Sequence, residues 1–315
     1  MARLRVGLVG PRRARQGLGP FLASFLEQEG CEVAAVCGRD PQKTQGAAIE
    51  FERTFGHPVR ALRDLAAFAG ADIEALVIAS PMESHLPALE TAFDLRLSAL
   101  CEKPLVAPGQ WGAARDLVDR FASSGLLLAE NCQWPYALGA FERLFGRPIP
   151  RPPRTFRMRL CPSGIGREMV VDALPHFLSV LQALAPLDAG SIRGPDLRFA
   201  GPERATLRFE VAGRTGRGTA IEAELLLERR PNQPRPASLE IDGQRMERRI
   251  GPGYRLSFED PASGRTVPSE DPLRLLVADF ARAAKGEDEA AAPRLSAPVG
   301  PRLRCLEGLL AGLIP

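Results

Sequence analysis

The stretch Leu100-Cys101-Glu102-Lys103-Pro104-Leu105 decides how the first half of the chain is interpreted. It begins within an apolar run, residues 97–101, that is typical of a buried parallel strand, and it then becomes polar at once. In a doubly wound sheet, ligands bind in the crevice beyond the carboxyl ends of the strands. A lysine there can reach a ligand, and a proline fixes the direction of the chain that follows. We therefore expect Lys103 to lie at the centre of a binding site.

Strand-like and helical segments alternate on both sides of this stretch. Short apolar runs predict buried strands, and the segments between them carry apolar residues at helical spacing. The predicted strands are 4–9, 31–37, 73–79, 97–101 and 126–130, and the predicted helices are 20–28, 42–55, 62–69, 86–95 and 111–123. This alternation predicts an α/β fold, with a Rossmann-type, doubly wound parallel sheet over residues 1–130.

The pattern changes after residue 131. Alternating apolar and polar residues predict half-buried strands at 155–161, 205–211, 220–227, 238–241, 246–250 and 255–258, and helical spacing predicts helices at 136–145, 169–184, 272–285 and 301–313. Turn signals such as Asp242-Gly243 separate the strands. We expect an α+β domain over residues 131–315 with a mostly antiparallel, open-faced sheet. The last helices of the chain could pack back on the first domain.

Helices of the second domain would cover only one face of this sheet. We expect the other face to be apolar, and such a face is usually buried against another surface. This predicts a homodimer or homotetramer that pairs through the C-terminal sheet.

Composition excludes several classes of protein. The chain has 315 residues, 45% of them hydrophobic and 25% charged, as in an ordinary globular protein of about two domains. A formal net charge of +3 is too small for a dedicated nucleic-acid-binding protein. The six cysteines lack metal-ligand spacing, so we expect no metal site and a reduced, cytoplasmic protein. No apolar run could cross a bilayer and no apolar signal segment is recognised, so we expect no membrane partner.

A glycine-containing loop follows the first predicted strand. Gly10 supplies the first glycine of the G-x-G-x-x-G dinucleotide fingerprint, but Arg12 and Arg15 stand at the next two positions, and Gly17 and Gly19 come only just before the helix. Backbone N–H groups at a helix N-terminus favour a pyrophosphate, and the arginines could add positive charge. The alternative is a surface loop whose arginines are merely solvated.

The end of the second predicted strand bears on the choice of cofactor. An NAD-binding protein usually carries a carboxylate there to accept the ribose hydroxyls, but Gly38 has no side chain. Arg39 could instead meet the 2′-phosphate of NADP, which favours NADP over NAD. Asp40 is close enough to reverse this choice, or it could simply cap the next helix.

Four features in order now resemble one family. They are the first strand with its glycine loop, Ser80-Pro81-x-x-x-His85, Glu102-Lys103-Pro104, and Asp172-x-x-x-His176 on a helix before the antiparallel sheet. The chain resembles the glucose-fructose oxidoreductase / inositol dehydrogenase (Gfo/Idh/MocA) family over nearly its whole length. The resemblance implies hydride transfer between a nicotinamide cofactor and a small polyol, sugar or related carbonyl substrate. It places the catalytic lysine, aspartate and histidine on Lys103, Asp172 and His176.

The chemistry of these three side chains supports the same roles. Oxidation of a secondary alcohol removes the hydroxyl proton as hydride leaves the carbon, and His176 titrates near neutral pH and can take or return that proton. Lys103 would hydrogen-bond the same oxygen and stabilise its developing negative charge. Asp172, one helical turn from His176, could orient the imidazole or bind a substrate hydroxyl. Besides the glycine loop, Gly38 and Arg39, we expect the cofactor to contact Ser80, Pro81, His85, Glu102 and Lys103.

Simpler interpretations of the same residues remain open at this point. Asp172, with Pro175 three residues on, could be a helix N-cap, and His176 could be a buried core histidine with satisfied hydrogen bonds. His85 could be only a first-turn residue of a helix near the cofactor. 

The sequence also departs from the family pattern. Met82 stands where asparagine is usual, Ser179 where aspartate is common, and Trp134 could line the substrate pocket as an apolar wall. These changes leave two alternatives to a dehydrogenase of polyols or sugars. One is a binding or regulatory protein that retains the fold without turnover, and the other is a reductase of a less polar biosynthetic intermediate.

Overall fold

The computed structural model describes residues 3–13, 17–212 and 220–313, and the side chains of these residues up to 311. The chain divides by its contacts into two compact units. Unit 1 comprises Met1–Asn131 and Leu273–Gly300, and unit 2 comprises Cys132–Pro272 and Pro301–Pro315. None of the helices in the described ranges is both long enough and apolar enough to span a membrane.

Unit 1 is built on a six-stranded parallel sheet with strand order β3-β2-β1-β4-β5-β6. Its strands are β1 (Leu4–Val9), β2 (Cys31–Cys37), β3 (Arg60–Leu62), β4 (Ala75–Ile78), β5 (Ser98–Cys101) and β6 (Leu128–Glu130). Apart from the short edge strand β3, in which Arg60 is exposed, these strands are near-continuous apolar runs buried on both faces, as in other parallel sheets. The predicted doubly wound parallel sheet is therefore confirmed.

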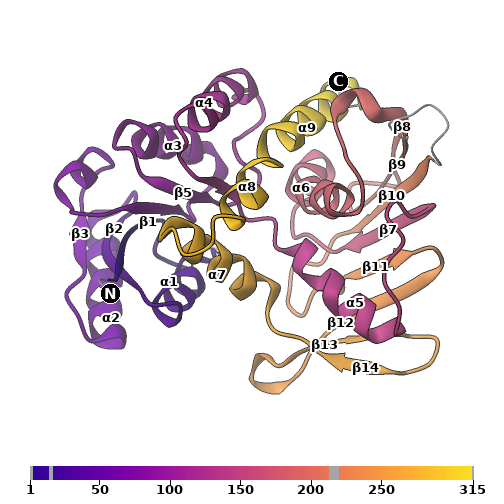
Figure 1. Ribbon diagram of the computed structural model, residues 1–315, viewed down its shortest axis with the longest axis horizontal. Helices are drawn as coiled ribbons and strands as arrows, with labels where there is room; N and C mark the ends of the chain where they lie inside the picture. Colours follow the sequence, from indigo (N-terminus) through magenta and orange to yellow (C-terminus); the bar gives the residue numbers. More distant parts are fainter. Residues whose placement is uncertain (1–2, 14–16, 213–219, 314–315) are drawn as a thin grey trace. The chain divides into compact units, whose positions relative to one another are not determined.

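Helices cover both faces of this sheet (Figure 1). They are α1 (Gly19–Gln28), α2 (Pro41–Phe55), α3 (His85–Asp94) and α4 (Trp111–Ser123). Helix α1 connects β1 to β2 and α2 connects β2 to β3, on one side of β1 in the sheet. Helix α3 connects β4 to β5 and α4 connects β5 to β6, on the other side. The chain thus reverses its direction of travel across the sheet between β1 and β4.

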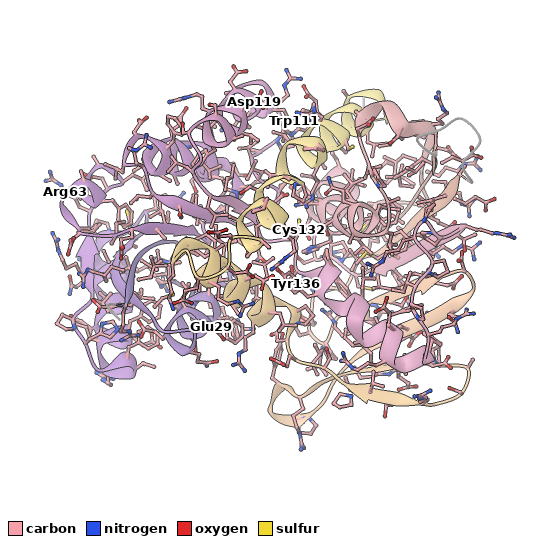
Figure 2. All side chains as sticks on the ribbon, in the orientation of Figure 1. Glu29, Arg63, Trp111, Asp119, Cys132 and Tyr136 are labelled. Atoms are coloured by element: carbon pink, nitrogen blue, oxygen red, sulfur yellow. The ribbon has the colours of Figure 1, made fainter. Side chains whose placement is uncertain are left out.

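Two helices from late in the sequence also belong to unit 1. They are α7 (Pro272–Ala284), apart from its first residue, and α8 (Ala291–Ser296). Glu29, labelled in Figure 2, lies beside α7: its carbonyl oxygen accepts a hydrogen bond of 2.8 Å from the Lys285 ammonium. The second domain expected over residues 131–315 is therefore interrupted, because residues 273–300 pack with the first.

Unit 2 is built on an eight-stranded sheet with order β14-β13-β12-β11-β7-β10-β9-β8. Its strands are β7 (Thr155–Leu160), β8 (Ile192–Phe199), β9 (Arg204–Val211), β10 (Ile221–Glu228), β11 (Ser238–Ile241), β12 (Gln244–Ile250), β13 (Leu256–Glu259) and β14 (Thr266–Pro268). Only β7 and β10 pair in parallel, and the other neighbours are antiparallel. This confirms the predicted mostly antiparallel sheet.

One face of the unit 2 sheet carries the core. The helices α6 (Gly166–Leu184) and α5 (Leu138–Phe145) contact the strands, and α9 (Val299–Leu313) contacts α6 through an Arg302–Gln182 hydrogen bond of 2.8 Å. Phe177 of α6 stacks on Phe156 of β7 with ring centroids 5.1 Å apart. Burial of these aromatic rings stabilises this layer.

The opposite face of the same sheet is charged, so the expected apolar face is wrong. Arg157 of β7 bridges Glu224 of β10 at 3.1 Å and Glu240 of β11 at 3.0 Å. Further ion pairs of 2.5–3.1 Å continue across the sheet, among them Arg208–Glu224, Arg159–Glu228, Arg249–Glu247 and Arg249–Glu259. The polar positions of the alternating strands are occupied by both signs of charge, and such a surface needs no cover from water.

A few elements differ from the sequence prediction. The predicted helix 62–69 is the end of strand β3 followed by a 3-10 turn, Ala66–Gly70. Strand β8 was not predicted, because Gly194 and Pro195 break its pattern; it lies at the sheet edge, where proline and an irregular register are tolerated. Strand β14 and helix α8 are short segments without a strong apolar period.

Candidate functional site

The carboxyl edge of the unit 1 sheet gathers the polar residues singled out from the sequence. Gly10 follows β1, Gly38 follows β2, Ser80 lies two residues beyond β4, and Glu102 follows β5. Backbone hydrogen bonds extend the ladder past the strands, with Gly10 N donating to Cys37 O at 2.8 Å and Glu102 N to Ile78 O at 2.8 Å. The chain reverses between β1 and β4, and this is the position of the ligand crevice in open α/β sheets.

Two glycines bring the first loop and helix α1 into close approach. A Cβ on Gly10, whose φ is +82°, would lie 2.6 Å from the Ser80 nitrogen. A Cβ on Gly19, the first residue of α1, would lie 2.2 Å from the Gly10 carbonyl oxygen. The longer loop thus still places a helix N-terminus against the first strand end, where backbone N–H groups favour a phosphate. Gly19 therefore performs the close-packing role of the fingerprint, which the sequence analysis had not assigned to it.

The arginines of this loop have different surroundings. Arg12 is exposed, and Gly17 is partly buried immediately before α1. The guanidinium of Arg13 lies over the Phe21 ring, 4.9 Å from its centroid, so this arginine is not merely solvated. Arg15 lies outside the described residues.

Asp40 caps helix α2. Its side chain accepts a hydrogen bond of 3.1 Å from the Lys43 backbone nitrogen, and the Lys43 ammonium lies 3.2 Å away. These hydrogen bonds lower the pKa of Asp40. Arg39 is exposed, and a Cβ on Gly38 would lie 2.7 Å from the Thr44 hydroxyl. The carboxylate nearest to the end of β2 is therefore already engaged by its own helix.

His85 connects the loop after β4 to the loop that carries Lys103. Its ring is 1% exposed, with Nδ1 3.0 Å from the Pro104 carbonyl oxygen and Nε2 2.8 Å from the Ser80 carbonyl oxygen. Burial lowers the pKa of His85, and the two carbonyl contacts only partly oppose this effect. His85 is the first residue of α3, but it does more than occupy a first turn: it fixes the chain next to Lys103.

Acidic side chains at the ends of β5 and β6 complete this part of the site. Glu102 accepts a hydrogen bond from the Asn131 side-chain amide. Glu130, which is 7% exposed, accepts a hydrogen bond of 3.0 Å from the Leu105 nitrogen. Glu130 and Asn131 were not predicted as site residues, although polar residues at the end of an apolar strand and directly after it were the available signal. Together with His85, these contacts hold the segment around the partly exposed Lys103 from both ends.

In unit 2, Asp172 and His176 lie together on one side of α6. The helix begins at Gly166 with Ile165 as its N-cap residue, so the interpretation of Asp172 as an N-cap is wrong. Between Met169 and Leu181 these two side chains alone are partly exposed, so His176 is not a fully buried core residue. Ser179 donates a hydrogen bond of 2.7 Å to the His176 carbonyl oxygen. The helix thus presents a carboxylate and an imidazole one turn apart.

Trp134 is buried in unit 2, but its surroundings are not purely apolar. The guanidinium of Arg248 lies over its ring, 5.3 Å from the centroid. Cys132 and Tyr136, labelled in Figure 2, flank it in the sequence, and the Cys132 thiol donates to the Pro175 carbonyl oxygen of α6 at 3.6 Å. The beginning of unit 2 is thereby fixed to the helix that carries Asp172 and His176.

The cysteines and acidic residues form no metal centre in the part of the chain that the structure describes. All six cysteines are buried, and none of them forms a disulfide. Burial raises the pKa of Cys31 to about 11 and that of Cys305 to about 12, so these thiols stay protonated and behave as small apolar side chains.

Comparisons with known proteins agree with this geometry. Residues 4–132 match the model of an oxidoreductase family with an NAD-binding Rossmann fold, Gfo/Idh/MocA. The chain is 25% identical over 271 residues to a D-apiose dehydrogenase of Rhizobium rhizogenes, covering 80% of this chain and 75% of that protein. It is 34% identical over 131 residues to dTDP-3,4-didehydro-2,6-dideoxy-alpha-D-glucose 3-reductase of Streptomyces antibioticus, covering 41% and 37%.

Among solved structures, a UDP-N-acetylglucosamine 3-dehydrogenase from Acidithiobacillus ferrooxidans has the same fold. It superposes with a TM-score of 0.66 at 20% identity, covering 98% of this chain and 100% of that one. The Rossmann domain, which contains the glycine cradle and Lys103, is thus the part of the chain that matches the Gfo/Idh/MocA family of oxidoreductases.

Proposed function

We propose that the protein is an NAD(P)-dependent oxidoreductase that acts on a CH–OH group or the corresponding carbonyl of a small polyol, sugar or related substrate. The observation that carries this proposal is that hydrogen bonds hold the chain on both sides of Lys103 at the carboxyl edge of the parallel sheet. Asn131 binds Glu102 before it, and His85 and Glu130 bind the backbone of Pro104 and Leu105 after it. The family match of the Rossmann domain and the similarity to a D-apiose dehydrogenase and a dTDP-sugar reductase support it.

The residues around the first loop fit a dinucleotide. At Gly10 and Gly19 a Cβ atom would clash with nearby backbone atoms. Because both residues are glycine, the first turn of α1 can lie next to the end of β1. The N–H groups of that turn would hold a pyrophosphate. A bound nicotinamide ring would supply the hydride acceptor or donor.

Side chains of the protein are proposed to transfer the proton and to stabilise the charge on the reacting oxygen. His176 is the proposed acid–base residue, which takes the substrate hydroxyl proton during oxidation and returns it during reduction. The Lys103 ammonium stabilises the negative charge that develops on the same oxygen. Asp172 lies one helical turn before His176 and orients the imidazole or binds a substrate hydroxyl.

Replacement of Lys103 tests the proposal. Lys103→Met should abolish turnover while the affinity for the nicotinamide cofactor stays within about tenfold, because methionine keeps the length of the side chain and removes only its charge. Lys285→Met is the matched control, since it removes an ammonium group that donates a hydrogen bond to the Glu29 carbonyl oxygen. Cofactor affinity is measured by nicotinamide fluorescence and turnover on a panel of polyols, sugars and their oxidised forms. Normal turnover by Lys103→Met would refute the assignment.

We propose that NADP is preferred over NAD. Gly38 provides no carboxylate at the end of β2, and Asp40 is engaged in capping α2. The exposed Arg39 side chain, which follows Gly38 in the sequence, is then the positively charged group proposed to bind a 2′-phosphate. Arg39→Ala should weaken NADP binding and leave NAD binding nearly unchanged, and equal loss for both cofactors would refute the contact.

A second candidate function is a binding or regulatory protein that retains the fold without turnover. The long first loop with Arg12 at a fingerprint glycine position favours it. Titration with NADPH and NADH decides, because binding of neither cofactor supports this candidate. A reductase of a less polar biosynthetic intermediate is a third candidate, which turnover on a substrate panel separates from the first; the Arg248 guanidinium over the buried Trp134 ring is an argument against an apolar pocket there.

A further inference from the structure

Arg248 stands on the face of the unit 2 sheet that carries the core, and it contacts Arg235. Side chains alternate between faces along a strand, so Arg248 in β12 shares the face of the buried Met246, and Glu247 and Arg249 point to the charged outer face. The backbone nitrogen of Arg248 donates a hydrogen bond of 2.9 Å to the Ala237 carbonyl oxygen, which extends the β11–β12 pairing toward Arg235. A guanidinium on a core face requires a reason, because charged groups are rarely buried without partners.

Arg248 is held in place by its neighbours. Its guanidinium lies over Trp134, and one of its terminal nitrogens donates a hydrogen bond of 2.8 Å to the Arg235 carbonyl oxygen. Burial lowers the pKa of Arg248, and the charges of Tyr254 and Asp271 partly offset this effect. Arg248 is thus fixed against an aromatic ring and positions the backbone of Arg235.

Arg235 has donors without acceptors. Its Nε and Nη2 atoms are buried, and neither has a hydrogen-bond partner among the residues that the structure describes. In a guanidinium these two N–H groups point in parallel from one edge, and that edge matches the two oxygens of a carboxylate or a phosphate. The empty edge is therefore a preformed bidentate site for an oxyanion.

Arg235 is electrostatically coupled to Asp172, one of the residues of the proposed function. Burial lowers the pKa of Arg235, and the carboxylate of Asp172 on α6 partly restores it. Asp172 therefore lies within electrostatic reach of Arg235, but its oxygens do not occupy the two buried donors. Buried donors without acceptors are destabilising, so an arrangement of this kind is stabilised when a ligand supplies the oxygens.

We propose that Arg235, supported by Arg248 stacked on Trp134, binds an anionic group of the substrate, a carboxylate or a phosphate, beside Asp172. This inference rests on the proposed function, because it names the class of sugar derivative that the oxidoreductase takes: one with a negatively charged oxyanion. Arg235 is a binding residue in this account, and Arg248 is a positioning residue that acts through it.

Calorimetric titration of the intact protein with three probes tests the site. The probes are D-glucuronate, D-glucose 6-phosphate and neutral D-glucose, at constant ionic strength. At least one anionic probe should bind about tenfold or more tightly than D-glucose, as expected for charge-assisted hydrogen bonds. The probe that gains identifies the anion as a carboxylate or a phosphate.

Variants assign the binding to Arg235. Arg235→Gln should lose about tenfold to a hundredfold in affinity for the anionic probe. Arg235→Lys, which keeps the charge but loses the parallel edge, should also lose affinity and decides the question if the glutamine variant does not fold. Arg249→Gln, on the outer face one residue from Arg248, is the matched control and should bind like wild type.

Two results would overturn the inference: equal binding of all three probes by the wild type, or unchanged affinity for the anionic probe in Arg235→Lys. Titration of NADPH and NADH on the same preparations keeps the two proposals apart. Oxyanion binding without cofactor binding refutes the proposed function alone, and cofactor binding without a preference for the anionic probes refutes this inference alone.

Discussion

Replacement of Gly19 by alanine tests whether the first loop and helix α1 form a cofactor cradle. The added Cβ would lie 2.2 Å from the Gly10 carbonyl oxygen and 2.9 Å from the Pro11 carbonyl carbon. The first distance is about 1.3 Å short of an ordinary nonbonded contact of about 3.5 Å. Both partners are backbone atoms, so no side chain can rotate away, and the helix or the loop has to move.

The magnitude follows from this shortfall. Overpacking of a tight site costs about 1–3 kcal/mol, and we expect Gly19→Ala at the upper end of this range because backbone has to shift. Gly46→Ala is the matched control: Gly46 lies within α2, and nothing is within 4 Å of its added Cβ. Alanine is favoured over glycine inside a helix by about 0.5–1 kcal/mol, so this control should be more stable than wild type. The two variants should therefore differ by about 3–4 kcal/mol in the free energy of unfolding.

Two assays read out the effect. Urea unfolding gives the free energy, and nicotinamide fluorescence gives the affinity for NADPH and NADH. Displacement of the first turn of α1 should weaken binding of both cofactors about tenfold or more, because phosphate hydrogen bonds to its N–H groups are charge-assisted. If Gly19→Ala is as stable as Gly46→Ala and binds both cofactors like wild type, the close approach and the cradle inferred from it are wrong.

Three further predictions concern stability and assembly. Acidification from pH about 7.5 to about 5 should destabilise the wild type more than His85→Gln in urea titrations, because burial lowers the pKa of His85. The neutral His85 side chain stabilises the folded protein fully above the unfolded pKa of about 6.5. This stabilisation is lost as the pH falls through the lower native pKa. Equal losses would contradict this. Phe177→Ala should cost about 3–5 kcal/mol, whereas Phe199→Ala, at a side chain 44% exposed, should change stability by about 0.5 kcal/mol or less; similar losses would refute the core assignment. The homodimer or homotetramer expected through the unit 2 sheet would have to bury charged pairs such as Arg157–Glu224. Salt screens such charges, so light scattering should show less assembly in about 1 M than in about 0.05 M NaCl. A molecular mass that does not depend on salt would count against pairing through this face.

The sequence predicted the elements whose burial pattern is local. Strands β1, β2 and β5 are buried on both faces, so they appear as apolar runs that end at glycine or polar residues, and the alternation with helices predicted a parallel sheet. Strands β7, β9 and β10 alternate because one face is buried. The prediction failed at β3 and β8, which are too short or too interrupted by Gly194 and Pro195 to show a period.

The candidate site could be predicted only in part. Lys103, Asp172 and His176 are recognisable because their residue types and spacing suggest chemistry. The partners that fix the segment around Lys103 are not recognisable in this way: His85 binds the Pro104 carbonyl oxygen across 19 residues, and Asn131 binds Glu102 across 29. Such contacts depend on which strands are neighbours, and no local pattern records strand order.

By itself, then, the sequence determined the fold class, the two kinds of sheet and the ends of the strands where chemistry is expected, because side-chain periodicity reports burial within one element. The tertiary structure alone decided that the outer face of the second sheet is covered by ion pairs, that Gly19 abuts Gly10, and that two buried donors of Arg235 have no acceptor among the residues that the structure describes. Those features arise where elements meet. They depend on the packing of segments far apart in the chain, which a linear pattern of residue types does not encode.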